Sequence, residues 1–138
     1  MAEIAQITSL FNRVYDSKYP IESVYDPRFW NTHIESRFIS LVACIEGKTI
    51  AHFALNPDKD YPDQVQLSFP VIDPDYTDYM PLLGTKLSEI IDRISEQRGW
   101  KLLSHFILGS AASSAAFIKL MGGFREVAIF PGYFPKSE

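Results

Sequence analysis

The feature that most constrains the fold is a change of hydrophobic period midway along the chain. In residues 64–72, QVQLSFPVI, apolar residues alternate with polar ones, which is typical of a strand. Leucines and isoleucines then recur at helical spacing over residues 83–94, and Arg98-Gly99 supplies a helix stop. A short apolar run follows at residues 101–109, KLLSHFILG, and predicts a strand covered on both faces. A strand, a long helix and a second strand in this order favour parallel pairing of the two strands.

The segments before this unit predict two helices and a hairpin. Residues 4–14 carry apolar side chains at intervals of three and four, and Asp26-Pro27 predicts the capped start of a second, short helix. Residues 38–55 hold two apolar runs on either side of Glu46-Gly47-Lys48, the pattern of an antiparallel hairpin. Pro70 lacks an N–H group for a ladder and predicts an edge or a bulge in its strand.

The end of the chain predicts a last helix, capped by Ser110 and stopped by glycine, followed by one or two strand pieces. We therefore expect a single domain over residues 1–138. Its fold class is α/β (α+β), with a mixed, mostly antiparallel central sheet and helices on both faces.

Composition restricts the function and the compartment. The formal net charge is -4 and the basic residues are scattered, which argues against a nucleic-acid partner. The single cysteine, Cys44, excludes an intrachain disulfide, and its place in an apolar run predicts a small buried residue. The sequence shows no secretory signal and no apolar run long enough for a bilayer, so we expect a soluble, cytoplasmic protein without a membrane partner. No histidine or cysteine spacing suggests a metal site.

Three stretches resemble the GNAT superfamily of acyl-CoA-dependent N-acetyltransferases. The hairpin VACIEGKTIAHFAL resembles the second and third strands of that family. VIDPDY, followed by GTKL, resembles the end of the fourth strand and the loop that opens the main helix. SAASSAAFIKLMGGFREV resembles the late helix that ends in Gly-Phe. The matches follow the family's order and span nearly the whole chain.

The resemblance implies an architecture and an activity. The sheet would be split between the family's fourth and fifth strands, here residues 64–72 and residues 101–109, and Pro70 is a local cause of that split. The protein would transfer an acyl group from acetyl-CoA, its co-substrate, or from another acyl-CoA, to a small-molecule or peptide amine by direct attack. A homodimer is left open. The alternative is a catalytically inactive GNAT-fold binding or regulatory domain.

The resemblance also implies a coenzyme site at the start of the main helix, where free N–H groups and the helix dipole favour a pyrophosphate. The family pattern there is Arg or Gln, two residues, Gly, one residue, then Gly or Ala. In this chain Tyr79 takes the first position, Leu82 takes the first glycine position, Gly84 matches, and Pro81 removes one N–H group. The cofactor-binding residues implied are Val71 and Ile72 for the pantetheine, Tyr79, Leu82, Leu83, Gly84 and Thr85 for the pyrophosphate, and Ser110 and Ser113 for the coenzyme arm.

Proton transfer requires titratable groups near the split. The family often uses a glutamate on the fourth strand, but that strand here offers only Gln64, Gln66 and Ser68. The catalytic candidates are therefore His105, Tyr76 and Tyr79. His52, in the predicted hairpin, has an equally suitable imidazole, and for both His52 and His105 the alternative is a hydrogen-bonded structural histidine in or beside the sheet.

Overall fold

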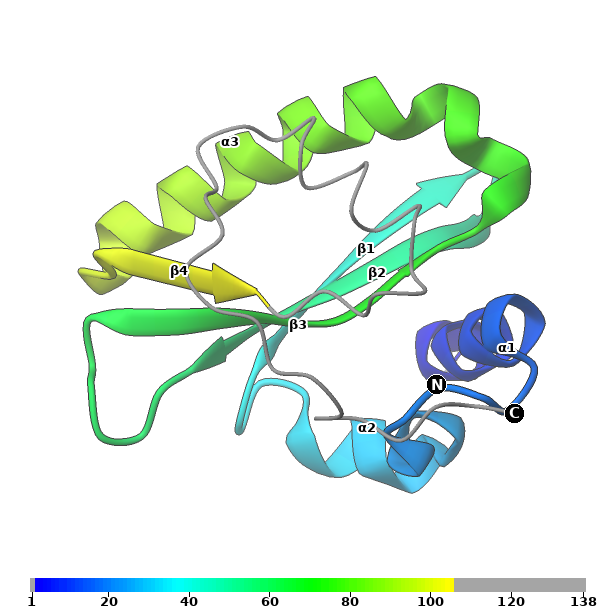
Figure 1. The fold of residues 1–138 in the computed structure, drawn as a ribbon, viewed down its shortest axis with the longest axis horizontal. Coiled ribbons are helices and arrows are strands. Elements are labelled where there is room, and N and C mark those ends of the chain that lie inside the picture. The colour runs from blue at the N-terminus through cyan, green and yellow to red at the C-terminus, as the bar shows by residue number, and fades with distance from the viewer. Residues whose placement is uncertain (1, 106–138) are drawn as a thin grey trace.

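The protein, seen in a computed structural model that describes residues 2–105, is a sheet covered by helices on both faces. Figure 1 shows α1 (Ala2–Tyr15) and α2 (Pro27–His33) on one side of the sheet and α3 (Met80–Arg98) on the other. Two 3-10 helices, η1 (Glu22–Tyr25) and η2 (Pro74–Tyr79), precede α2 and α3. The strands are β1 (Ile39–Ile45), β2 (Lys48–Pro57), β3 (Gln64–Ile72) and β4 (Leu102–His105).

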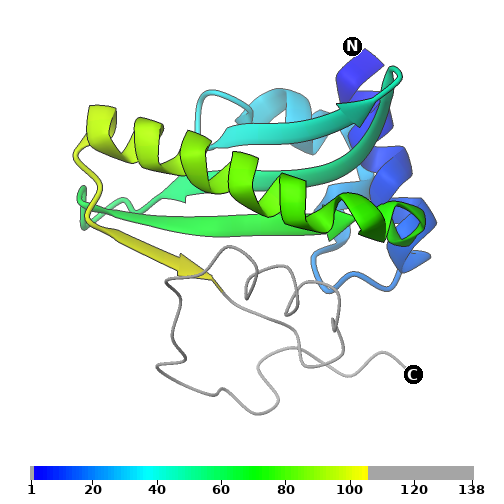
Figure 2. The same cartoon turned by 90° about the horizontal axis from the view of Figure 1, so that it is seen from above.

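The sheet topology confirms the predicted fold class. The spatial order is β1-β2-β3-β4, in which β1/β2 and β2/β3 are antiparallel and β3/β4 is parallel. The parallel pair follows from the α3 crossover, as the change of hydrophobic period predicts. β4 pairs with β3 from Gln64↔Leu102 to Leu67↔His105, and Figure 2 shows the two strands diverging toward their carboxyl ends. The predicted last helix and closing strand pieces lie outside the described residues.

The local signals for turns and helix ends are confirmed. Glu46 and Gly47 both have positive φ, 49° and 80°, which is the backbone of a two-residue hairpin turn. The Asp26 carboxylate accepts a hydrogen bond from the Arg28 N–H at 2.9 Å and caps α2. Gly99 ends α3 with a φ of 72°.

Two predictions of burial are wrong. Cys44 is exposed, and its Sγ lies 3.6 Å from the Thr49 Oγ1. It belongs to β1, the first strand in the sheet order, where Val42, on the same face, is also exposed. The prediction that the strand in residues 101–109 is covered on both faces is wrong at Leu102, whose side chain is 53% exposed.

The core has two parts, one on each face of the sheet. Beneath the sheet, the buried residues are Ile4, Ile7, Leu10, Phe11, Tyr19, Val24, Trp30, Phe38, Ala54, Phe69 and Val71. Above it, they are Ala51, Phe53, Leu55, Val65, Leu67, Ile72, Met80, Leu87 and Ile91. Because α1, α2 and α3 each bury one apolar stripe, the sheet is fixed from both sides.

A β-bulge in β3 decides which face each later residue meets. His52 pairs with Val71 and Ala54 pairs with Ser68, so two β3 residues, Phe69 and Pro70, lie opposite the single residue between them on β2. Phe69 has a φ of 50°, the left-handed conformation found at such bulges. The extra residue reverses the alternation, because Val65 and Leu67 face α3 whereas Phe69 and Val71 face α1 and α2. Pro70 therefore marks a bulge, as predicted.

His52 is the buried partner of this bulge. Its side chain has no exposed surface, its Nδ1 lies 2.9 Å from the Phe69 carbonyl oxygen, and its Nε2 lies 2.8 Å from the Ser40 Oγ. A carbonyl can only accept, so Nδ1–H donates to Phe69 and Nε2 accepts from the Ser40 hydroxyl. Burial lowers the pKa of His52 from 6.5 to about 4, although the hydrogen bond to Phe69 opposes this. The geometry agrees with a structural role for a neutral imidazole.

We expect the protein to lose stability in mild acid because of His52. In the folded state the ring takes up a proton only near pH 4, whereas in the unfolded chain it does so near pH 6.5. The stabilisation by neutral His52 is complete above pH 6.5. As the pH falls toward 4, the free energy of unfolding decreases by about 3 kcal/mol. Chemical denaturation at a series of pH values measures this loss. His52→Gln should lower stability at neutral pH but flatten the slope in this window, and an unchanged slope would assign the acid sensitivity to other groups.

Candidate functional site

The carboxyl-terminal half of β3 presents a peptide edge that points away from β2. The Asp73 N–H donates to the Ile50 carbonyl oxygen at 2.7 Å, so the peptide groups of Asp73 face β2. Alternation along the strand then directs the peptide groups of Val71 to β2 and those of Ile72 to the opposite side. Among residues 2–105, no strand pairs with Ile72 on that side. Its N–H and C=O groups therefore point away from β2 and have no strand partner among the described residues.

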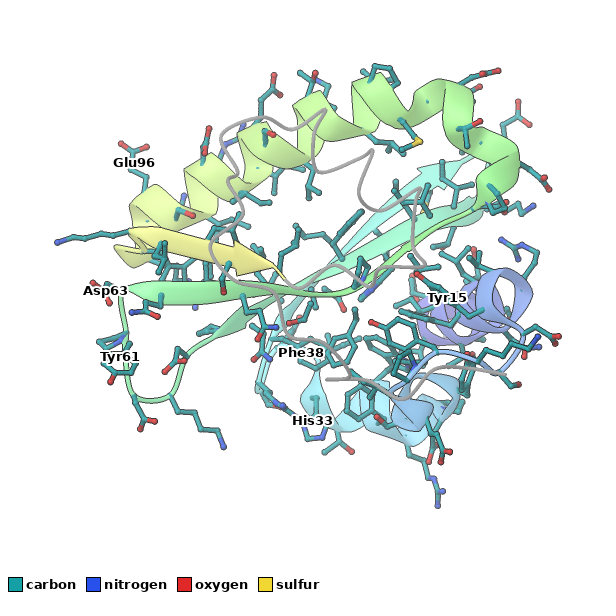
Figure 3. All side chains as sticks on the ribbon, in the orientation of Figure 1. Tyr15, His33, Phe38, Tyr61, Asp63 and Glu96 are labelled. Carbon is teal, nitrogen blue, oxygen red and sulfur yellow. The ribbon has the colours of Figure 1, made fainter. Side chains whose placement is uncertain are left out.

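The last turn of α1 holds this half of β3 from below. The Tyr15 hydroxyl donates to the Pro70 carbonyl oxygen at 3.1 Å, directly at the bulge. Arg13 donates from Nε and Nη2 to the Asp73 Oδ2, at 3.2 and 2.8 Å. Figure 3 shows Tyr15 on the same side of the sheet as His33 and Phe38 of the α2 region. The path of β3 after the bulge is thus set by side chains of α1 as well as by β2.

Asp73 joins three segments through one buried carboxylate. Its side chain is 1% exposed, its Oδ1 accepts from the Asp75 N–H at 3.0 Å, and the Lys48 Nζ lies 3.8 Å from its Oδ2. Burial by itself would raise the pKa of Asp73, but the Asp75 N–H, the Arg13 guanidinium and the Lys48 ammonium outweigh it and hold the pKa below its usual value. Asp73 is therefore ionised at neutral pH and fixes the entry into η2.

Tyrosines gather near the bulge on the α1 side. The rings of Tyr15 and Tyr19 lie 4.9 Å apart, and the Tyr25 hydroxyl accepts a hydrogen bond from the Tyr19 N–H at 3.0 Å. Burial raises the pKa of the Tyr19 phenol, and the neighbouring Tyr15 and Tyr25 add to this effect. Tyr19 stays protonated at neutral pH and cannot act there as a base.

The start of α3 continues directly from η2. The Met80 N–H donates to the Thr77 carbonyl oxygen, and Pro81, in the first turn, has no N–H group. Tyr79 occupies the N-cap position and makes no capping hydrogen bond with its side chain. An anion at this helix end therefore meets fewer free amides than at a glycine-rich turn: of the next three residues only Leu82 precedes the first i→i−4 bond of α3, whereas the N–H groups of Leu83 and Gly84 donate within the helix.

Within residues 2–105, no cluster of at least three His, Cys, Asp and Glu side chains is arranged for a metal ion. None of the helices in this range is both long and apolar enough to cross a bilayer.

Comparison with known proteins gives a consistent architecture. No family model and no curated protein sequence matches the chain. An aminoglycoside acetyltransferase from an uncultured soil metagenomic sample, solved with sisomicin, superposes with a TM-score of 0.75 at 15% identity, over 99% of this chain and 90% of that one. The ribosomal-protein-S18-alanine N-acetyltransferase of Escherichia coli superposes with a TM-score of 0.73 at 21% identity, over 99% of this chain and 81% of that one. The aminoglycoside enzyme AAC(6')-Iy, solved with a bisubstrate analogue of CoA, gives a TM-score of 0.71 at 13% identity, over 99% and 93% of the two chains.

The fold is that of the GNAT N-acetyltransferases. The resemblance seen in the sequence is thereby confirmed for the architecture. The hairpin stretch forms β1 and β2, VIDPDY ends β3 and enters η2, and GTKL lies in α3. These likenesses fall below 25% identity and concern the fold alone.

The GNAT pyrophosphate turn, as predicted from the sequence, lies at the η2–α3 junction. Leu82 is 56% exposed and Tyr79 is 43% exposed, so neither side chain is packed into the start of α3. Leu83 packs against the core above the sheet and Gly84 is buried. Thr85 is exposed, and its hydroxyl donates to the Pro81 carbonyl oxygen at 3.1 Å.

The remaining predicted residues of the described part lie on η2, β3 and β4. The rings of Tyr76 and Tyr79 lie 6.1 Å apart on η2, and the Lys48 Nζ lies 5.2 Å from the centre of the Tyr76 ring. Val71 and Ile72 bury their side chains on opposite faces. His105 ends the described part of β4, opposite Leu67. Ser110 and Ser113 lie outside the described residues.

Sequence reasoning missed Arg13, Tyr15 and Asp73, the residues that hold the bulged strand. Asp73-Pro74 carries a usable signal, since it repeats the Asp26-Pro27 pattern and caps η2 in the same way. Nothing in the spacing of the sequence links Arg13 to Asp73, which lie 60 positions apart.

Asp73→Asn should lower the free energy of unfolding at pH 7 by about 2 kcal/mol. The amide oxygen can still accept from the Asp75 N–H, but the charge that faces Arg13 and Lys48 is lost. Asp75→Asn changes the net charge equally at an exposed neighbour and should cost less than about 0.5 kcal/mol. The pKa of Asp73 is lowered in the folded protein. The difference in stability loss between the two variants should therefore be present above pH 3.8 and shrink as the pH falls below it. Urea denaturation of both variants measures it, and equal losses would show that the buried pairing adds nothing.

Proposed function

We propose that the protein is a GNAT-fold acyltransferase that takes an acyl group from acetyl-CoA, or from another acyl-CoA, and passes it to an amine. The observation that carries this proposal is the outward-facing peptide edge at Ile72, immediately after the Phe69–Pro70 bulge. An extended pantetheine chain carries amides that can pair with such an edge in the manner of an added strand.

The coenzyme site follows from this placement. Ile72 would supply the backbone hydrogen bonds, and Val71 would keep the edge rigid through its buried side chain and its pairing with His52. The pyrophosphate would lie at the start of α3, against the Leu82 amide and the positive end of the helix dipole, with Tyr79, Leu83, Gly84 and Thr85 around it. Ser110 and Ser113 are assigned to the coenzyme arm by the family resemblance alone.

The chemistry requires few groups from the protein. The amine nitrogen attacks the thioester carbonyl, a carbon–nitrogen bond forms, the carbon–sulfur bond breaks, and the thiolate leaves. One proton must leave the amine and one must reach the thiolate. His105, on β4 beside Leu67, is our candidate to receive the amine proton, directly or through water. Tyr76 is the candidate donor to the thiolate, and Tyr79 is the alternative donor in place of its position beside the pyrophosphate, because one phenol cannot reach both ends of the pantetheine. Proximity along β3 supplies much of the rate enhancement, so no covalent enzyme intermediate is invoked.

The acceptor class is a small-molecule or peptide amine. Support comes from the similar structures, one solved with the aminoglycoside sisomicin and another named for an alanine of a ribosomal protein. A cytoplasmic location remains a proposal from composition.

A GNAT-fold binding or regulatory domain without catalysis is the second candidate. The η2–α3 junction favours it, because the Met80 N–H is already bonded to Thr77 and Pro81 offers none. A pyrophosphate would then be held by fewer amides than the fold usually provides.

Measurement of coenzyme binding and turnover separates the two candidates. Acetyl-CoA at one hundred times its dissociation constant should stabilise the native protein by about 2.7 kcal/mol, read as a rise in the unfolding midpoint. CoA release should then appear with at least one member of a panel of aminoglycosides, polyamines and amino-terminal peptides. Binding without release from any amine would favour the regulatory domain, and the absence of both would refute the transferase.

Leu82→Glu should weaken acetyl-CoA binding about tenfold, because a carboxylate would face the pyrophosphate. Leu82 is 56% exposed, so the change should leave the fold intact. Ile90→Glu is the matched control, since Ile90 lies further along α3 and is 38% exposed. Calorimetric titration gives both dissociation constants, and equal values for the two variants would place the pyrophosphate elsewhere.

A further inference from the structure

A pocket lined by polar and charged residue types lies beside α1, on the face of the sheet opposite α3. Its volume is about 280 Å³, and it opens between α1 and the β1–β2 turn. Its lining residues are Gln6, Ser9 and Arg13 from α1, and Gly47, Lys48 and Thr49 from the turn and the start of β2. The three α1 residues follow one another at intervals of three and four, so they form a single polar stripe beside the apolar stripe of the helix.

The pocket offers a ligand several hydrogen-bond donors. The Gln6 Oε1 accepts from the Thr49 N–H at 2.8 Å, which leaves the two N–H groups of the Gln6 amide for a ligand. The Thr49 Oγ1 is paired with the Cys44 Sγ at 3.6 Å. The Ser9 hydroxyl makes no hydrogen bond to any residue between 2 and 105. A ligand here therefore meets amide and hydroxyl donors.

The charge of the pocket is positive. Arg13 and Lys48 both approach Asp73, whose carboxylate is 1% exposed and cancels one of the two charges. Arg13 uses Nε and Nη2 for Asp73, so Nη1 remains for another partner. Lys48 keeps a looser contact of 3.8 Å and a side chain that is 47% exposed. The carboxylate thus orients two cations without neutralising both.

We propose that this pocket binds the phosphate group of a small soluble ligand. A tetrahedral dianion presents acceptors in several directions, which matches donors that converge from a helix and a turn better than a planar carboxylate does. None of the lining residues belongs to the proposed pyrophosphate position at the start of α3, although Lys48 also lies 5.2 Å from the centre of the Tyr76 ring on η2, so the pocket is a second site and does not rest on the proposed transferase activity. A phosphate bound here would contact Arg13 and Lys48, the two cations that hold the Asp73 carboxylate at the entry into η2.

Titration with inorganic phosphate at constant ionic strength tests the site. The amide resonances of Gly47 and Thr49 should shift with a saturable dependence on phosphate concentration. Lys48→Met should weaken binding about tenfold, and Ser9→Glu should abolish it, since it places a carboxylate among the donors. Lys59→Met removes the same charge from the exposed β2–β3 loop and should leave the dissociation constant within about twofold. Unfolding midpoints without phosphate verify that each variant is folded, and Lys48→Arg should restore binding.

Each possible outcome decides the proposal. A linear, unsaturated response, or an equal loss in Lys48→Met and Lys59→Met, would show non-specific screening and overturn it. Glycerol 3-phosphate and acetate provide two further arms. Binding of the monoester at least as tight as that of inorganic phosphate would identify an organic phosphate as the ligand, and weaker binding would identify the free ion. Acetate binding as tight as phosphate binding would overturn the assignment to a phosphate group.

Discussion

One extra residue in β3 determines the arrangement of the proposed active site. Phe69 and Pro70 occupy the space of a single residue opposite β2, so every later side chain of the strand meets the other face of the sheet. The carbonyls at the bulge receive side-chain hydrogen bonds, from His52 to Phe69 and from Tyr15 to Pro70. A buried carbonyl without a partner costs about 1–3 kcal/mol, so these two side chains make the irregular backbone tolerable.

The bulge also explains why the strand ends in a position suited to a ligand. A bulged strand bends and twists more strongly, and β4 already diverges from β3 in Figure 2. Beyond the bulge the strand is held by β2 on one edge and by α1 from below, through Arg13 and Asp73. The other edge is left to the Ile72 peptide groups. The same geometry that stabilises the strand therefore creates the surface on which the proposed transfer depends.

The sequence predicted the parts of the fold that depend on local chemistry. Periodicity located β3, α3 and β4, the positive-φ residues at Glu46 and Gly47 suit the predicted hairpin, and Gly99 ends the long helix. Burial of Cys44 was mispredicted because apolar neighbours along the chain do not reveal that the strand lies at an edge.

The sequence predicted the position of the candidate site but not the contacts that set its geometry. The resemblance pointed to the turn after β3, but contacts between distant segments set its geometry, as Arg13 with Asp73 illustrates. No local pattern records such a pair. The alternation of apolar and polar residues also mispredicts which face Phe69 meets, because the bulge adds one residue to β3 and shifts the side chains after it to the other face.

The shared carboxylate of Asp73 has a consequence for how this protein can diverge. α1, the β1–β2 turn and η2 converge on one buried charge, so a shift of any one of them disturbs the other two. New specificity is therefore easiest to acquire where no such shared contact exists, as in the β2–β3 loop, whose residues 58–63 are all exposed. That region can be lengthened or reshaped while the segment leading into α3 keeps its place.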